Sequence, residues 1–139
     1  MSEGFSEAIQ KALDTALVAF GAANGIKVCL ENVGAPTDTS VPYLAGYMLP
    51  AGIDSADLYF TDRRTGIYQI DINYASATNS AKLNQMTDKL NLAFKPGSWL
   101  TRSPVCVEIT KFEPAKITPA NGWATKPVTI EWVTHTERL

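Results

Sequence analysis

The stretch GIYQIDINY, residues 66–74, alternates apolar and polar side chains with a period of two residues. The apolar set comprises Tyr68, Ile70, Ile72 and Tyr74. The polar set comprises Gln69, Asp71 and Asn73. This period is typical of a β-strand with one face against a core. The polar face has four possible roles: one side of an active site, a binding surface, a contact between subunits, or a solvated surface of a sheet.

Length and composition indicate one globular unit. The chain has 139 residues, of which 45% are hydrophobic and 19% are charged. Such a chain can bury a core without disulfides or metals, so we expect a single domain over residues 1–139. The net charge is −2 and no cluster of Lys or Arg is present. Contact with nucleic acid is therefore not expected.

The N-terminus, MSEGFSEAIQ, lacks the basic flank and apolar core of a secretory signal. No window is apolar over the length that a bilayer requires, so we expect a cytoplasmic protein without membrane contact. Cys29 and Cys106 lie in apolar, strand-like runs and not in a CxxC or Cys/His cluster. We expect both to be buried free thiols rather than metal ligands or a disulfide.

Two segments have the three- and four-residue apolar spacing of amphipathic helices. The first runs from Phe5 to Phe20 and is followed by Asn24-Gly25, which is a typical helix stop. The second carries its apolar stripe from Leu83 to Phe94 and ends at Lys95-Pro96-Gly97. We expect both apolar stripes to pack on a sheet.

The remaining chain alternates between strand and turn signals. The expected strands are residues 26–30, 43–49, 58–60, 66–74, 105–110 and 128–133. The expected irregular segments are loops 34–42 and 50–57, a hairpin turn at 62–66, and an extended connection over 114–123. The order of helix, strands, helix and strands predicts an α+β fold, with a mainly antiparallel mixed sheet and two helices packed on one face. The predicted core includes Leu13, Leu17, Ile70, Ile72, Leu90, Val107 and Ile130.

Residues suited to chemistry are scarce. The single histidine, His135, lies near the C-terminus in a polar context, and we expect it to be solvated rather than a general base. Asp54, Asp57, Asp62 and Asp71 lack the register of a calcium loop, and three of them lie in turn-like segments. Phosphate-binding and dinucleotide-binding glycine motifs are absent. We therefore predict no catalytic, cofactor or metal residues, no cofactor, and no enzymatic activity.

Other residues suit contacts with proteins. Trp99 and Trp123 fall between the expected regular elements, where they can anchor a partner or close the ends of the core. Adjacent arginines in the expected turn can meet an acidic partner or simply be solvated. The candidate protein-contact residues are Arg63, Arg64, Gln69, Asp71 and Asn73.

Two stretches resemble a family of small phage proteins related to the tail terminator of lambda-like siphophages. TGIYQIDINYASATNSAKLNQMTDKLNLAF (65–94) contains the pattern G-x-Y-Q-x-D-x-x-Y and an amphipathic helix. PANGWATKPVTIEWV (119–133) contains G-W-x-x-x-P-V-x-I-x-W. The resemblance covers most of the chain.

The resemblance implies a structural protein of a phage or prophage. Its members form a six-membered ring on the tail, cap the tail tube, stop its polymerisation and present a head-joining surface. The implied partners are further copies of the chain, the tail tube protein and a head-neck connector protein. The implied location is the virion tail, with assembly in the host cytoplasm. The alternatives are another neck, tail-completion or minor tail protein, or a small cytosolic binding domain.

Overall fold

The computed structural model describes residues 5–30, 41–55, 61–75, 80–102, 105–120 and 122–137. These residues form two helices and seven strands. In chain order they are α1 (Phe5–Asn24), β1 (Lys27–Leu30), β2 (Tyr43–Ser55), β3 (Thr61–Ala75), α2 (Ser80–Ala93), β4 (Trp99–Arg102), β5 (Val105–Pro114), β6 (Thr118–Ala120) and β7 (Trp123–Glu137).

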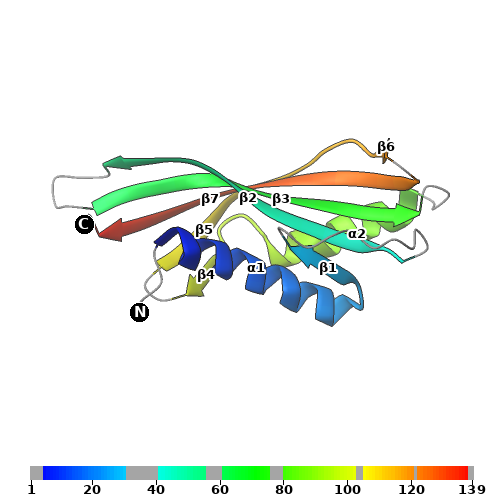
Figure 1. Cartoon of the computed structure of the whole chain (residues 1–139), viewed down its shortest axis with the longest axis horizontal. Coiled ribbons are helices and arrows are strands. Elements are labelled where there is room, and N and C mark those ends of the chain that lie inside the picture. Colours follow the sequence, from blue (N-terminus) through cyan, green and yellow to red (C-terminus); the bar gives the residue numbers. More distant parts are fainter. Residues whose placement is uncertain are drawn as a thin grey trace.

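The strands form one mixed, twisted sheet, and both helices lie on the same side of it (Figure 1). The strand order is β1-β2-β3-β7-β5-β4, and the short β6 pairs with β7 beside this path. Only β1 and β2 pair in parallel; the other pairings are antiparallel. The predicted α+β class, with a mainly antiparallel sheet and two helices on one face, is therefore confirmed.

The core lies between the helices and the sheet. Leu13 and Leu17 of α1 and Leu90 of α2 are fully buried, as their helical spacing predicts. Ile70 and Ile72 of β3, Val107 of β5 and Ile130 of β7 are also fully buried. All seven residues predicted for the core are confirmed. Alternate residues of each strand therefore face the helices, as the period of two requires.

Helix α1 ends where the sequence predicts, by a local mechanism. It continues to Asn24, whose side-chain amide donates a hydrogen bond to the carbonyl of Phe20 at 2.9 Å. Gly25 follows with a φ of 65°, in the left-handed region that glycine tolerates best. The predicted stop at Asn24-Gly25 is confirmed. Neither of the two described helices combines the length and the apolar character needed to cross a membrane.

Two irregular segments expected from the sequence are wrong. Residues 50–55 continue β2, and residues 62–66, expected as a turn, form the start of β3. The reason is long-range pairing: Pro50 lies opposite Gly66, and Asp54 lies opposite Arg63, with a bulge between Pro50 and Gly52. Residues 34–40 of the expected loop 34–42, residues 56–57 of the expected loop 50–57, and the expected strand at 58–60 lie outside the described residues.

Three further expectations are corrected near the second helix and β5. Trp99 lies in β4, an edge strand, and Trp123 is the first residue of β7, so neither lies between regular elements. Cys106 is exposed, because Val105 and Val107 on either side of it take the buried positions of β5. Cys29 is buried as expected, and both cysteines are free thiols. The connection over 114–123 contains β6.

Candidate interaction face

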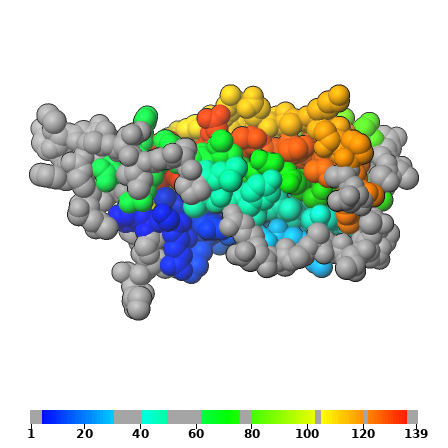
Figure 2. All heavy atoms as spheres, turned by 45° about the horizontal axis from the view of Figure 1, so that its top comes forward, coloured from blue at the N-terminus to red at the C-terminus, as the bar shows by residue number. Residues whose placement is uncertain are grey.

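The helices leave one side of the sheet uncovered, and we call this side the open face. Figure 2 shows β2, β3 and β7 side by side on the surface, with α1 below them. The register of the strands assigns the residues that alternate with the core positions to this face. They include Tyr43, Ala45, Tyr47 and Leu49 of β2, Ile67, Gln69, Asp71 and Asn73 of β3, Lys111 and Glu113 of β5, and Trp123, Thr125, Pro127, Thr129, Glu131 and Val133 of β7.

Asp71 is the centre of a polar network on the open face. The hydroxyl of Tyr47 donates a hydrogen bond to Asp71 Oδ2 at 3.2 Å, and Gln69 Nε2 donates one to Asp71 Oδ1 at 3.1 Å. Burial, together with the charge and the hydrogen bond of Asp71, raises the pKa of Tyr47 to about 12. The phenol therefore stays protonated at neutral pH and holds the carboxylate in place as a donor.

Asn73 extends this network to β7. Its side-chain amide donates to the backbone carbonyl of Asp71 at 3.1 Å and accepts a hydrogen bond from the hydroxyl of Thr125 at 2.7 Å. Asn73 is only 5% exposed, so these bonds satisfy an amide that burial would otherwise destabilise. The network links β2, β3 and β7 and fixes the side-chain rotamers of this part of the open face.

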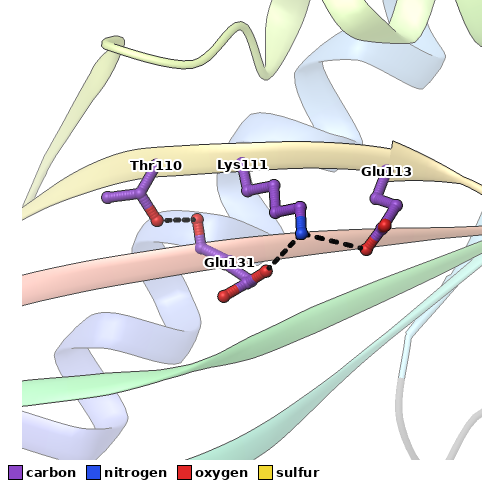
Figure 3. A network of polar contacts seen from close by, with 4 residues as sticks. All are labelled: Thr110, Lys111, Glu113 and Glu131. Carbon is purple, nitrogen blue, oxygen red and sulfur yellow. Dashed lines mark hydrogen bonds and ion pairs between the residues drawn. The ribbon is translucent and has the colours of Figure 1, made fainter.

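A second polar group lies on β5 and β7 (Figure 3). Lys111 Nζ lies 3.6 Å from a carboxylate oxygen of Glu113 and 3.6 Å from one of Glu131. The hydroxyl of Thr110 donates to the backbone carbonyl of Glu131 at 3.1 Å. The register shifts between Ile109 and Lys111, which places Thr110 in a bulge. These ion pairs are about half exposed, so they orient charges more than they stabilise the fold.

Aromatic and apolar side chains also lie on the open face. Tyr43 and Trp123 meet edge to face, with ring centroids 4.9 Å apart, and each is only 8% exposed, so they form a small buried cluster with Cys29. Burial, followed by the nearby Cys29 and Asp71, raises the pKa of Tyr43. Leu49 is 47% exposed and Trp99, which shares this side of the sheet, is 58% exposed. The apolar surface that a partner could reach on the open face therefore comes from side chains such as Leu49 and Trp99, beside the ordered polar network, and not from the buried Tyr43 and Trp123.

The two candidate arginines lie on opposite sides of β3. Arg63 is exposed on the open face, opposite His135 of β7. Arg64 points to the helix side, where its guanidinium lies 4.9 Å from the ring centroid of Phe5 in α1. This cation–π contact gives Arg64 a role in attaching the start of α1 to the sheet. Of the five sequence candidates, the structure therefore brings only Gln69, Asp71 and Asn73 into one network.

The residues considered for chemistry do not form one site, although the strand register places Asp54 of β2 and His135 of β7 on either side of Arg63. Asp62 and Asp71 lie at separate points of β3, about 30 Å apart at the usual rise of a strand. His135 is exposed on β7. Among the residues that the structure describes, no three His, Cys, Asp or Glu side chains are placed to hold a metal ion. Asp57 lies outside the described residues.

Sequence reasoning missed several residues of the open face. Tyr47 and Thr125 complete the network of Asp71 and Asn73, and Lys111 joins two carboxylates. Tyr47 has a signal in the sequence, because it alternates with the core positions Leu44 and Gly46 in β2. Its pairing with Gln69 across the sheet has none, because the register between β2 and β3 depends on residues 22 positions apart.

The chain matches the family model of the phage tail terminator protein over residues 8–132 and belongs to this family. It is therefore a structural protein of a bacteriophage tail. One solved structure superposes on it with a TM-score of 0.74 at 18% identity, covering 94% of this chain and 96% of the other, which supports the fold alone. No curated protein matches the chain.

Proposed function

We propose that this protein caps the end of the tail tube as a ring of six copies, stops tube polymerisation and presents a surface to a head-neck connector protein. Membership of the tail terminator family supports a role in the tail. The observation that carries the finer proposal is the open face, where Tyr47, Gln69 and Asn73 hold Asp71 within an ordered network. A preordered polar surface loses little side-chain entropy when a partner binds.

The acidic residue at the centre of this network also suits a reversible contact. Polar contacts of this kind favour assembly at the tube end, where several subunits bind together, over association in free solution. Arg63 on the same face and Arg64 on the helix side are further contact candidates. The protein would act without a cofactor, a membrane or a nucleic-acid ligand, through surfaces alone.

Electron microscopy of tubes assembled with and without the protein tests this function. Tubes of the tail tube protein should stop growing and carry a ring at one end when the wild type is added. Asp71→Asn should reduce capping while the unfolding temperature remains near that of the wild type. Phe112→Tyr, a conservative change on the helix side of β5, is the matched control and should cap normally.

Two results would contradict the proposal. Uncapped tubes, with binding of the protein to isolated head connectors, would favour another neck or tail-completion protein. A hydrolytic or transferase activity that His135→Ala or Asp71→Asn abolishes would favour an enzyme.

A further inference from the structure

The two outermost strands of the sheet, β1 and β4, have unpaired outer edges in the part of the chain that the structure describes. Each is four residues long. An exposed strand edge presents backbone N–H and C=O groups that match another extended strand. These backbone groups by themselves therefore favour one kind of partner, another β-strand, whatever the side chains are.

The groups that β4 presents follow from its pairing with β5. Ile109 N donates to Ser98 O at 2.9 Å, and Ile109 O accepts from Gly97 N at 2.7 Å, so both backbone groups of Ile109 point toward the chain that leads into β4. Along an antiparallel strand, residues whose backbone groups bond to the partner strand alternate with residues whose backbone groups point away from it. Leu100 therefore bonds to β5, whereas the N–H and C=O groups of Trp99 and Thr101 point outward. Side chains come close together where the backbone groups of opposite residues do not bond to each other. Thr101 and Cys106 fit this description, because Thr101 Oγ1 and Cys106 Sγ share a side-chain hydrogen bond of 3.4 Å. Both Trp99 and Thr101 are exposed.

The strand directions select the arrangement. The parallel pair β1–β2 is followed by antiparallel pairings of β2 with β3, β3 with β7, β7 with β5 and β5 with β4. An even number of reversals separates β2 from β4, so β1 and β4 run in the same direction. Rotation about a ring axis preserves strand direction along that axis, so β4 of one copy would meet β1 of the next in parallel.

Charge complementarity favours the same junction. Lys27 of β1 is exposed, and Glu108 of β5 lies opposite Trp99 of β4. Neither charge has an ion-pair partner among the described residues. Joining the two edges would bring the Lys27 ammonium over the exposed indole of Trp99 and toward the Glu108 carboxylate, which combines a cation–π contact with an ion pair.

We propose that the outer edge of β4 pairs in parallel with the outer edge of β1 of a second copy of this chain. The pairing is heterologous, because different edges meet, and such interfaces form a ring when the rotation between neighbouring copies closes. This strand pairing rests on the ring proposed above and specifies which surfaces of neighbouring copies form that ring. The edges are staggered. β1 adjoins residues 43–46 of β2, which lie level with residues 125–128 of β7, whereas Glu108, beside β4, lies level with Val133. Closed barrels have staggers of this kind, in which strands tilt relative to the axis.

Thr101→Pro tests the edge directly. Proline removes the outward N–H of Thr101 and places its ring where the neighbouring strand would lie, and an edge strand tolerates this change. Ring formation on tube ends should need a protein concentration roughly tenfold higher or more, the weakening expected from losing one or two hydrogen bonds per junction. Thr101→Val keeps the N–H and is the matched control, which should form rings as the wild type does.

Charge exchange keeps the test independent of any effect of proline on folding. Lys27→Glu and Glu108→Lys should each weaken ring formation, and the double variant should recover it. A carbodiimide should also join Lys27 of one copy to Glu108 of the next, and mass spectrometry should identify this cross-link only in assembled rings.

The outcomes separate the edge pairing from the tail function. The edge pairing would be overturned if Thr101→Pro formed rings at the same protein concentration as the wild type. It would also be overturned if the double charge variant formed rings no better than the sum of the two single effects predicts. Neither result would contradict tube capping. A two-fold dimer with β4 against β4, or binding of single copies to the tube, would also overturn the edge pairing. Rings that depend on Thr101 but do not affect tubes would support the pairing and contradict the capping function.

Discussion

The hydroxyl of Tyr68 on β3 donates a hydrogen bond to the carboxylate of Asp14 on α1, 2.5 Å away. Tyr68 is fully buried, and its ring also stacks near Phe94, with centroids 6.5 Å apart. Gly46 on β2 makes this approach possible, because a Cβ atom there would lie 2.5 Å from the Tyr68 hydroxyl oxygen. The first helix is thus positioned on the sheet by a polar contact inside an otherwise apolar layer.

Gly46→Ala should destabilise the protein by about 1–3 kcal/mol, the usual range for overpacking. The added methyl group would meet Leu17 Cδ2 as well as the Tyr68 hydroxyl, each at 2.5 Å. Urea unfolding measures the change. Combining Gly46→Ala with Tyr68→Phe removes one of the two clashes, so the double variant should lose less stability than the sum of the single changes. Strict additivity would show that the chain relieves the clash elsewhere.

Ile70→Asp should destabilise the fold by several kcal/mol, because it places an unpaired charge at a fully buried position. Thermal unfolding followed by circular dichroism checks this. Thr129→Asp, on the half-buried open face of β7, is the control and should change stability much less. Equal effects of the two changes would mean that the two faces of the sheet are assigned the wrong way round.

Asp71→Asn should lower the pKa of Tyr47 from about 12, because the charge of Asp71 contributes to the rise after burial itself. Titration of phenolate absorbance measures this, and Tyr47→Phe identifies the signal. The folded pKa lies above the value of about 10 for an unfolded tyrosine. The stabilising contribution is therefore present below pH 10 and is lost as the pH rises from about 10 through 12. This loss should be smaller in Asp71→Asn, and an unchanged pKa would exclude the contact.

The free protein should be a monomer or a weak oligomer at micromolar concentration. The ring junction proposed above joins strands of only four residues, and the open face carries a polar network around Asp71. Such contacts become strong only when a tube end holds several copies together. Sedimentation velocity tests this expectation, and a stable hexamer in the absence of tubes would contradict it.

Local patterns in the sequence determined the elements that fold by their own periodicity. The apolar spacing in 5–20 and 83–94 defined both helices, and the alternation in 66–74 defined the buried and open faces of β3. Burial of one side of an amphipathic element follows directly from such spacing, which is why all seven predicted core residues lie in the core. The family patterns around Gly66 and Gly122 indicated the class of protein.

Only the tertiary structure decided where weak local preferences give way to long-range pairing. Asp62 and the two arginines favour a turn locally, but hydrogen bonding to β2 and β7 on either side makes them strand, and places Arg63 and Arg64 on opposite faces. Asp71 became the centre of a network because the register brought Tyr47 within reach of it. Register depends on the whole sheet packing against both helices, and no short stretch of sequence contains that information.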